Sequence, residues 1–163
     1  MNKARLLMMV AVIVPLLLLL AYVAISDFAP VTGTTSVHYS SFVVEGKRYG
    51  LTYIATNETG LQRGLMNTKV TGNTTMLFVF PTQGYYSFWM FGVNSSLDII
   101  WISAPSGSSV GKVVYLEAQV PPCNASISCT FYHPSVQANM VIEAKGGFAA
   151  ANGVEVGTAV SFN

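Results

Sequence analysis

Residues 76–103, MLFVFPTQGYYSFWMFGVNSSLDIIWIS, decide the fold of this chain. Three apolar runs lie in this stretch, at residues 76–81, 88–90 and 97–102, and two turn-like gaps separate them. The runs are rich in Phe, Val, Ile and Trp and are bounded by Pro and Gly, which is typical of buried strands rather than of a helix. We therefore expect three consecutive strands here.

The flanking sequence extends this β pattern. Alternating apolar and polar residues predict a hairpin of residues 37–43 and 49–55 around Gly46, and further strands at residues 112–120, 138–144 and 158–162. Thr56 and Asn57 can cap a short helix over residues 58–66, and a second short helix is expected at residues 146–152, before Gly153. The predicted fold is mainly β (β-rich α+β), an antiparallel or mixed sheet arranged as a sandwich or small barrel with one or two short helices.

The N-terminus reads as a membrane segment. Lys3 and Arg5 precede an unbroken apolar run at residues 6–25, and twenty helical residues span roughly 30 Å, the thickness of a bilayer core. The cations favour an N-terminus inside the cell and a domain of residues 37–163 outside it, after a linker at residues 27–36. Residues 24–26 also suit a signal-peptide cleavage site, so a cleaved signal peptide is the alternative to a retained single-pass anchor at residues 1–26.

The charge balance limits the partners. Charged residues make up only 9% of the 163 residues, and after Lys3 and Arg5 the remainder of the chain has six cations and seven acids. Nucleic-acid binding requires clustered cations, so we expect no nucleic-acid partner. The membrane, through the N-terminal segment, is the partner that the sequence favours, with a membrane-complex or cell-surface protein as a further partner.

Cys123 and Cys129 are the only cysteines, and they flank a short polar loop. Outside the cytoplasm such a pair is expected to form a disulfide. A two-thiolate metal site is the alternative, in which His133 is the nearby further ligand. Four N-glycosylation patterns, all in predicted turns or helix starts, begin at Asn57, Asn73, Asn94 and Asn124, and this chain is therefore expected to be a glycoprotein.

Catalytic motifs are scarce. The chain has no Gly-x-Ser-x-Gly elbow, phosphate-binding loop, dinucleotide fingerprint or His-Glu-x-x-His motif. Asp98 is taken as the one acid embedded in an apolar run, and such a carboxylate usually accepts structural hydrogen bonds. The alternative is an enzyme in which Asp98 is the acid or base, supported by Tyr132 or His133.

The methionines suggest a second chemistry. Met66 and Met90, with Trp89 beside Met90, could hold Cu(I) through soft thioethers, although methionine more often fills gaps in a core. Trp89, Met90, Asp98 and Tyr132 are the binding residues that the sequence suggests. No resident cofactor or metal is expected.

Several motifs together resemble the domain of unknown function 192 family. They are Arg63-Gly64-Leu65-Met66, residues 76–81, Phe88-Trp89-Met90, residues 97–100, residues 118–123 with Cys129 and Tyr132, residues 141–143, and residues 153–157. The resemblance covers residues 42–162, and the paired cysteines resemble those of archaeal members. It implies a compact, mainly β domain, often behind a signal or anchor, with no assigned reaction or cofactor.

One departure from the family pattern concerns the residues after Phe88-Trp89-Met90. Members commonly continue with Lys-Asn-Thr and a proline before Leu-Asp, whereas this chain has Phe91-Gly92-Val93 and Ser96. If those polar residues line a site, this chain has lost part of it. The function expected from the sequence is that of a membrane-anchored, extracytoplasmic, non-enzymatic binding or accessory domain.

Overall fold

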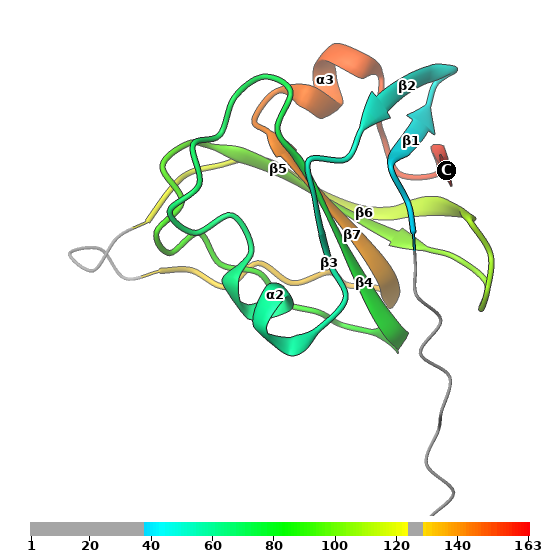
Figure 1. Cartoon of the computed structure of the whole chain (residues 1–163), viewed down its shortest axis with the longest axis horizontal. Helices are drawn as coiled ribbons and strands as arrows, with labels where there is room; N and C mark the ends of the chain where they lie inside the picture. Colours follow the sequence, from blue (N-terminus) through cyan, green and yellow to red (C-terminus); the bar gives the residue numbers. More distant parts are fainter. Residues whose placement is uncertain (1–37, 124–128) are drawn as a thin grey trace, which may run out of the picture. The chain divides into compact units, whose positions relative to one another are not determined.

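The computed structural model describes residues 38–123 and 129–163, which form one curled eight-stranded sheet and two short helices (Figure 1). The elements are β1 (Ser41–Val44), β2 (Lys47–Gly50), β3 (Tyr53–Ala55), α2 (Glu58–Arg63), β4 (Thr75–Gly84), β5 (Leu97–Ser103), β6 (Val110–Val120), β7 (Ala138–Lys145), α3 (Phe148–Asn152) and β8 (Ala159–Phe162). The prediction of a mainly β fold with two short helices is confirmed.

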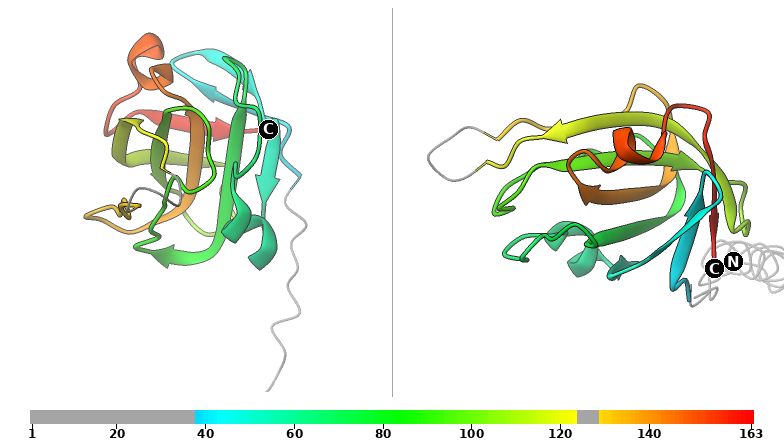
Figure 2. Two further views of the ribbon diagram at one scale, coloured as in Figure 1. Left: turned by 90° about the vertical axis from the view of Figure 1, so that its left-hand side faces the viewer. Right: turned by 90° about the horizontal axis from the view of Figure 1, so that it is seen from above.

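The strand order explains why the sheet curls. The order is β2-β1-β8-β6-β5-β7-β4-β3, and only the β3–β4 pair is parallel. The two outermost strands, β2 and β3, are consecutive in the chain, and residues 51 and 52 alone connect them. Leu51 N–H donates to Ser40 and Thr52 N–H donates to Thr75, so this short connection holds both ends of the sheet. The result is a half-barrel (Figure 2).

The two faces of the sheet bury different sets of side chains. The inner core fills the inside of the curl, and its main members are Phe42, Val44, Leu77, Ile100, Ile102, Val113, Met140, Ile142, Val160 and Phe162. The outer layer covers the other face of the central strands, and its main members are Leu65, Met76, Phe78, Phe88, Met90, Leu97, Ile99, Trp101 and Val141. Residues 97–102 are all buried because β5 lies between the two sets. A strand buried on both faces reads as a continuous apolar run, as residues 97–102 do.

Two strand predictions are wrong. Residues 88–90 form no strand of the sheet; Phe88 makes an isolated bridge to Tyr132, and Phe91 makes one to Cys123. This segment crosses the outer layer, where its neighbours are loops. Residues 49–55 are not one strand either, because the chain leaves β2 at Gly50 and enters β3, at the opposite end of the sheet, at Tyr53. Because the alternation of apolar residues continues through residues 51 and 52, the sequence pattern does not show that the chain changes strands there.

The turns and helices follow their local sequence. Glu45 and Gly46 both have positive φ, 48° and 72°, as a tight hairpin turn requires. Asn57 is the N-cap of α2, and its side chain accepts a hydrogen bond from Gly60 N–H. Helix α2 ends at Arg63, earlier than predicted, where Gly64 also has a positive φ of 51°. Helix α3 ends at Asn152, as predicted, and Gly153 is its C-cap.

The predicted membrane segment and linker lie outside the described residues. Within residues 38–123 and 129–163, no helix is long and apolar enough to cross a membrane. The predicted disulfide is confirmed, because Cys123 and Cys129 are bonded and their Cα atoms lie 5.6 Å apart.

Candidate functional site

Asp98 lies on β5 with no exposed surface, and backbone groups occupy its carboxylate. One oxygen accepts hydrogen bonds from Gln119 N–H at 2.7 Å and Gly147 N–H at 3.1 Å, and the other accepts from Ala149 N–H at 2.7 Å. Hydrogen bonds to a carboxylate are strong in such a setting. They fasten the end of β6 and the start of α3 to β5, which gives Asp98 a structural task.

Glu143 is a second buried acid, which the sequence analysis overlooked. It lies on β7 within the apolar run at residues 140–144, is 3% exposed, and pairs with Met76 and Ile99 on the adjacent strands. Its Oε2 has no hydrogen-bond partner among the described residues. The sequence signal was the same as for Asp98, an acid inside a strand of apolar residues.

The environment of Glu143 changes its protonation. Burial raises the pKa of the Glu143 carboxyl from 4.5 to about 8, because the charged form loses its hydration. Gly64 covers this carboxyl, and a Cβ at Gly64 would lie 3.8 Å from Oε2 and 3.5 Å from the Phe78 ring. Burial therefore favours the protonated, neutral form of Glu143.

Residues 88–92 form an extended strip across the outer layer. Phe88 and Tyr132 exchange two backbone hydrogen bonds of 2.7 and 2.8 Å, and on the other side Cys123 bonds to Met90 and Gly92 at 3.3 Å. Side chains of an extended strip point alternately to its two sides. Phe88 and Met90 are buried, at 8% and 1% exposure, whereas Trp89 is 41% exposed.

The outward side of the strip carries an aromatic row made of Phe91, Trp89 and Phe131. Trp89 stacks with Phe91 at a ring-centroid distance of 5.5 Å and with Phe131 at 5.7 Å. Phe131 is opposite Trp89 because Phe88 pairs with Tyr132. Phe131 is 59% exposed, so the row is open to solvent at Trp89 and Phe131, whereas Phe91 is half-buried. Of its members, only Trp89 was a predicted binding residue.

The inward side of the strip holds the aromatic row in place. The Phe88 ring lies 4.8 Å from Phe78 and 5.6 Å from Trp101, edge to face in both cases. The Trp101 indole N–H donates to the Tyr86 carbonyl at 2.9 Å, just before the strip. At the other end Asn67 N–H donates to the Gly92 carbonyl at 2.8 Å. The row is therefore fixed before any partner arrives, which lowers the entropic cost of binding.

The other predicted binding residues do not join the row. Met90 is buried in the outer layer, Asp98 is tied to α3, and Tyr132 is half-buried against the outer layer. The Met66 side chain lies against Gly92. Trp89 points outward and Met90 inward, so the structure does not gather the Met66, Met90 and Trp89 set proposed for Cu(I) on one face. No group of three or more His, Cys, Asp or Glu side chains suited to a metal occurs in the described residues.

Three predicted glycosylation sites lie on the surface. Asn57, Asn73 and Asn94 are exposed, and the carbonyl oxygen of the Asn57 side chain is occupied as the cap of α2. Asn124 lies outside the described residues. Glycosylation at these positions stays a prediction.

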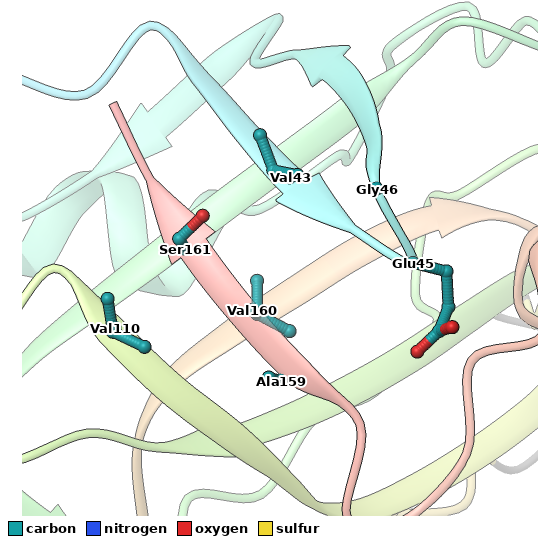
Figure 3. Close-up of a pocket in the computed structure, with 7 residues that line it drawn as sticks. All are labelled: Val43, Glu45, Gly46, Val110, Ala159, Val160 and Ser161. Atoms are coloured by element: carbon teal, nitrogen blue, oxygen red, sulfur yellow. The ribbon is translucent and has the colours of Figure 1, made fainter.

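Two open hollows lie beside β6 and β8, and they share Val110 and Ala159. The first, of about 330 Å³, crosses β1, β8 and β6 (Figure 3) and is lined by Val43, Glu45, Gly46, Val110, Ala159, Val160 and Ser161. The second, of about 580 Å³, extends to Gln83, Pro105 and Lys112. Each has one charged side chain, and neither reaches Asp98, Glu143 or the aromatic row. We assign them no function.

The family model of DUF192, described as "Uncharacterized ACR", matches residues 44–162, so the chain belongs to this family. The resemblance drawn from the sequence motifs is confirmed. Among curated proteins, none matches the chain.

Two crystal structures share the fold. One is a proposed transcription regulator from Sinorhizobium meliloti, with a TM-score of 0.62 and 20% sequence identity, and the match covers 77% of this chain and 96% of that protein. The other is a protein of unknown function from Novosphingobium aromaticivorans, with a TM-score of 0.62 and 24% identity, covering 81% of this chain and 89% of that protein. At these identities the likeness extends to the fold alone.

Proposed function

We propose that this chain is an extracytoplasmic binding or accessory module, held at the cell membrane by its N-terminal apolar segment, with the aromatic row as its contact surface. The observation that carries the proposal is the row itself. The exposed rings of Trp89 and Phe131 stack on each other, and the half-buried ring of Phe91 extends the row along the strip. Aromatic side chains that are exposed and held in place are typical of surfaces that recognise a partner.

A binding role agrees better with the described residues than catalysis does. Asp98, the candidate acid or base, accepts three backbone hydrogen bonds and is enclosed. The two residues proposed to support Asp98 have other surroundings: Tyr132 pairs with Phe88, and His133 is exposed. The near-neutral body supports a partner other than nucleic acid.

Membrane fractionation combined with protease accessibility tests the proposal. We expect the full chain in the membrane fraction, resistant to extraction by high salt, and cleaved by protease added outside intact cells. A chain recovered in the soluble fraction, or one protected until the cells are opened, would contradict the proposed location. Peptide mapping of the same samples would reveal sugars on Asn57, Asn73, Asn94 or Asn124.

A further inference from the structure

We propose that the aromatic row lies in the interfacial region of the lipid bilayer, so that the domain rests on the membrane that anchors it. This inference names the partner of the contact surface and rests on the proposed function. It adds a second membrane contact, made by the folded domain and independent of the N-terminal segment.

The first argument is the absence of charge along the segments that carry the row. Residues 70–97 include Trp89 and Phe91, and residues 118–142 include Phe131, yet neither segment contains Asp, Glu, Lys or Arg. Aromatic side chains, Trp above all, are enriched where the hydrocarbon core meets the headgroups, since one end of the ring is apolar and the other tolerates water. Such contact needs no charge on either side.

The second argument is the side from which the rings point. The strip buries Phe88 and Met90 against the outer layer and leaves Trp89 and Phe131 outward, at 41% and 59% exposure. A single exposed apolar side chain is ordinary, but here two exposed rings stack on each other. The row presents apolar area to solvent, and removing that area from water is favourable.

The third argument is the length of chain between the two proposed membrane contacts. Residues 26–37 separate the apolar run from the first described residue, His38. Twelve residues reach at most about 40 Å when fully extended. A folded domain of this size has a radius of gyration of about 14 Å. The tether therefore keeps the domain beside the bilayer, at a high local concentration, and is long enough for any face to touch it.

Trp89 is its own reporter in the test. The chain has two tryptophans, and Trp101 is fully buried. The full chain is reconstituted into phosphatidylcholine vesicles whose lipid is brominated high on the acyl chains, which quenches nearby indoles. We expect the vesicles to carry the chain on flotation and the bromines to quench most of the Trp89 emission. The Trp89→Phe variant, which keeps only Trp101, loses this quenching.

A matched control places the reporter elsewhere. Val156 is 62% exposed and lies between α3 and β8, on the side of the inner core. The double variant Trp89→Phe, Val156→Trp has the same number of tryptophans, and we expect its new indole to stay in water, quenched by iodide and not by brominated lipid. The emission of Trp89→Phe, which comes from Trp101 alone, verifies that this variant is folded, and far-ultraviolet circular dichroism does so for the double variant.

The outcomes separate the two proposals. If the chain floats with the vesicles but Trp89 is quenched by iodide and not by brominated lipid, the bilayer contact is overturned and the anchor is kept. The row would then bind a protein partner. Failure to float in detergent-free vesicles overturns the anchor and the bilayer contact together. Quenching that appears only with anionic lipid, or disappears in high salt, also overturns the inference, because an uncharged row does not depend on headgroup charge.

Discussion

Asp98 and Glu143 lie one residue out of register on neighbouring strands, yet they face opposite sides of the sheet. Asp98, at the inner core, is fully buried and accepts three backbone hydrogen bonds. Glu143, under the outer layer, is almost as deeply buried, and its Oε2 has no partner among the described residues. On the inner face, the Asp98 carboxylate joins β6 and α3 to β5. The outer face keeps an unsatisfied acid and an exposed aromatic row, so we look for function on the outer face.

Removing the Asp98 carboxylate tests the structural half of this comparison. Asp98→Ala leaves the N–H groups of Gln119, Gly147 and Ala149 without their acceptor, the first two in partly buried places and the third in a buried one. We expect the free energy of unfolding to fall by about 3–5 kcal/mol at pH 7. Urea unfolding followed through the buried Trp101 measures it. Asp98→Asn keeps one acceptor oxygen and should lose less; a loss below about 1 kcal/mol for the alanine variant would contradict the structural task.

Glu143→Gln tests the other half, through pH. The folded pKa of about 8 lies above the ordinary 4.5, so the folded chain binds a proton that the unfolded chain releases. The contribution of Glu143 to stability is therefore full below about pH 4.5 and is lost as the pH rises to about 8, at up to 1.4 kcal/mol per pH unit. Glu143→Gln cannot lose this proton.

The measurement for Glu143 compares two chains across pH. We expect the stability of Glu143→Gln relative to the natural chain to rise by on the order of 3 kcal/mol between pH 5 and pH 8. Taking the difference cancels the titration of the groups that both chains share. A constant difference over this range would mean that Glu143 ionises at an ordinary pKa, and that water or a partner group reaches its carboxyl.

The disulfide belongs to the outer layer and has no counterpart inside the curl. Cys123 borders the strip at Gly92, and Cys129 precedes Phe131 by two residues, so the bond ties together both segments that flank the aromatic row. We expect Cys123→Ser to lower the free energy of unfolding by about 2 kcal/mol while the fold is kept. Amide exchange should speed up at Tyr132 and Gly92 and stay slow in β5. Equal loosening of β5 would show that the two faces are not independent.

The sequence predicted one face of this structure better than the other. Strands β4, β5, β6 and β7 were expected close to their observed places, because continuous or alternating apolar runs report burial in a sheet directly. Residues 88–90 have the same alternation, but their partners are Cys123 and Tyr132 in loops. Alternation reports which side chains are inward. It does not report whether the neighbour is a strand.

The candidate site was only partly visible for the same reason. Trp89 was predicted as a binding residue because it is an aromatic residue next to Met90. Phe131 joins the row only through the pairing of Phe88 with Tyr132, which are far apart in the chain. Phe91 was treated as a loss of family polar residues. In the structure it extends the row by stacking on Trp89. Glu143 could have been found by the criterion applied to Asp98.

The smallest expected loss of stability is that of Trp89→Ala, and it is compared with the loss at Phe88, the adjacent residue of the strip. Phe88 lies between Phe78 and Trp101, so Phe88→Ala should cost about 3–5 kcal/mol through the cavity that it leaves. Trp89 is 41% exposed and stacks on the other two rings of the row, so Trp89→Ala should cost no more than about 1 kcal/mol. Unfolding of both variants in one buffer measures the pair. If Trp89→Ala were as damaging as Phe88→Ala, the row would be part of the fold, and its exposure would no longer argue for a partner. A small cost means that the exposed ring of Trp89 does little for stability, and binding then becomes the simplest physical reason for stacking it on the exposed ring of Phe131.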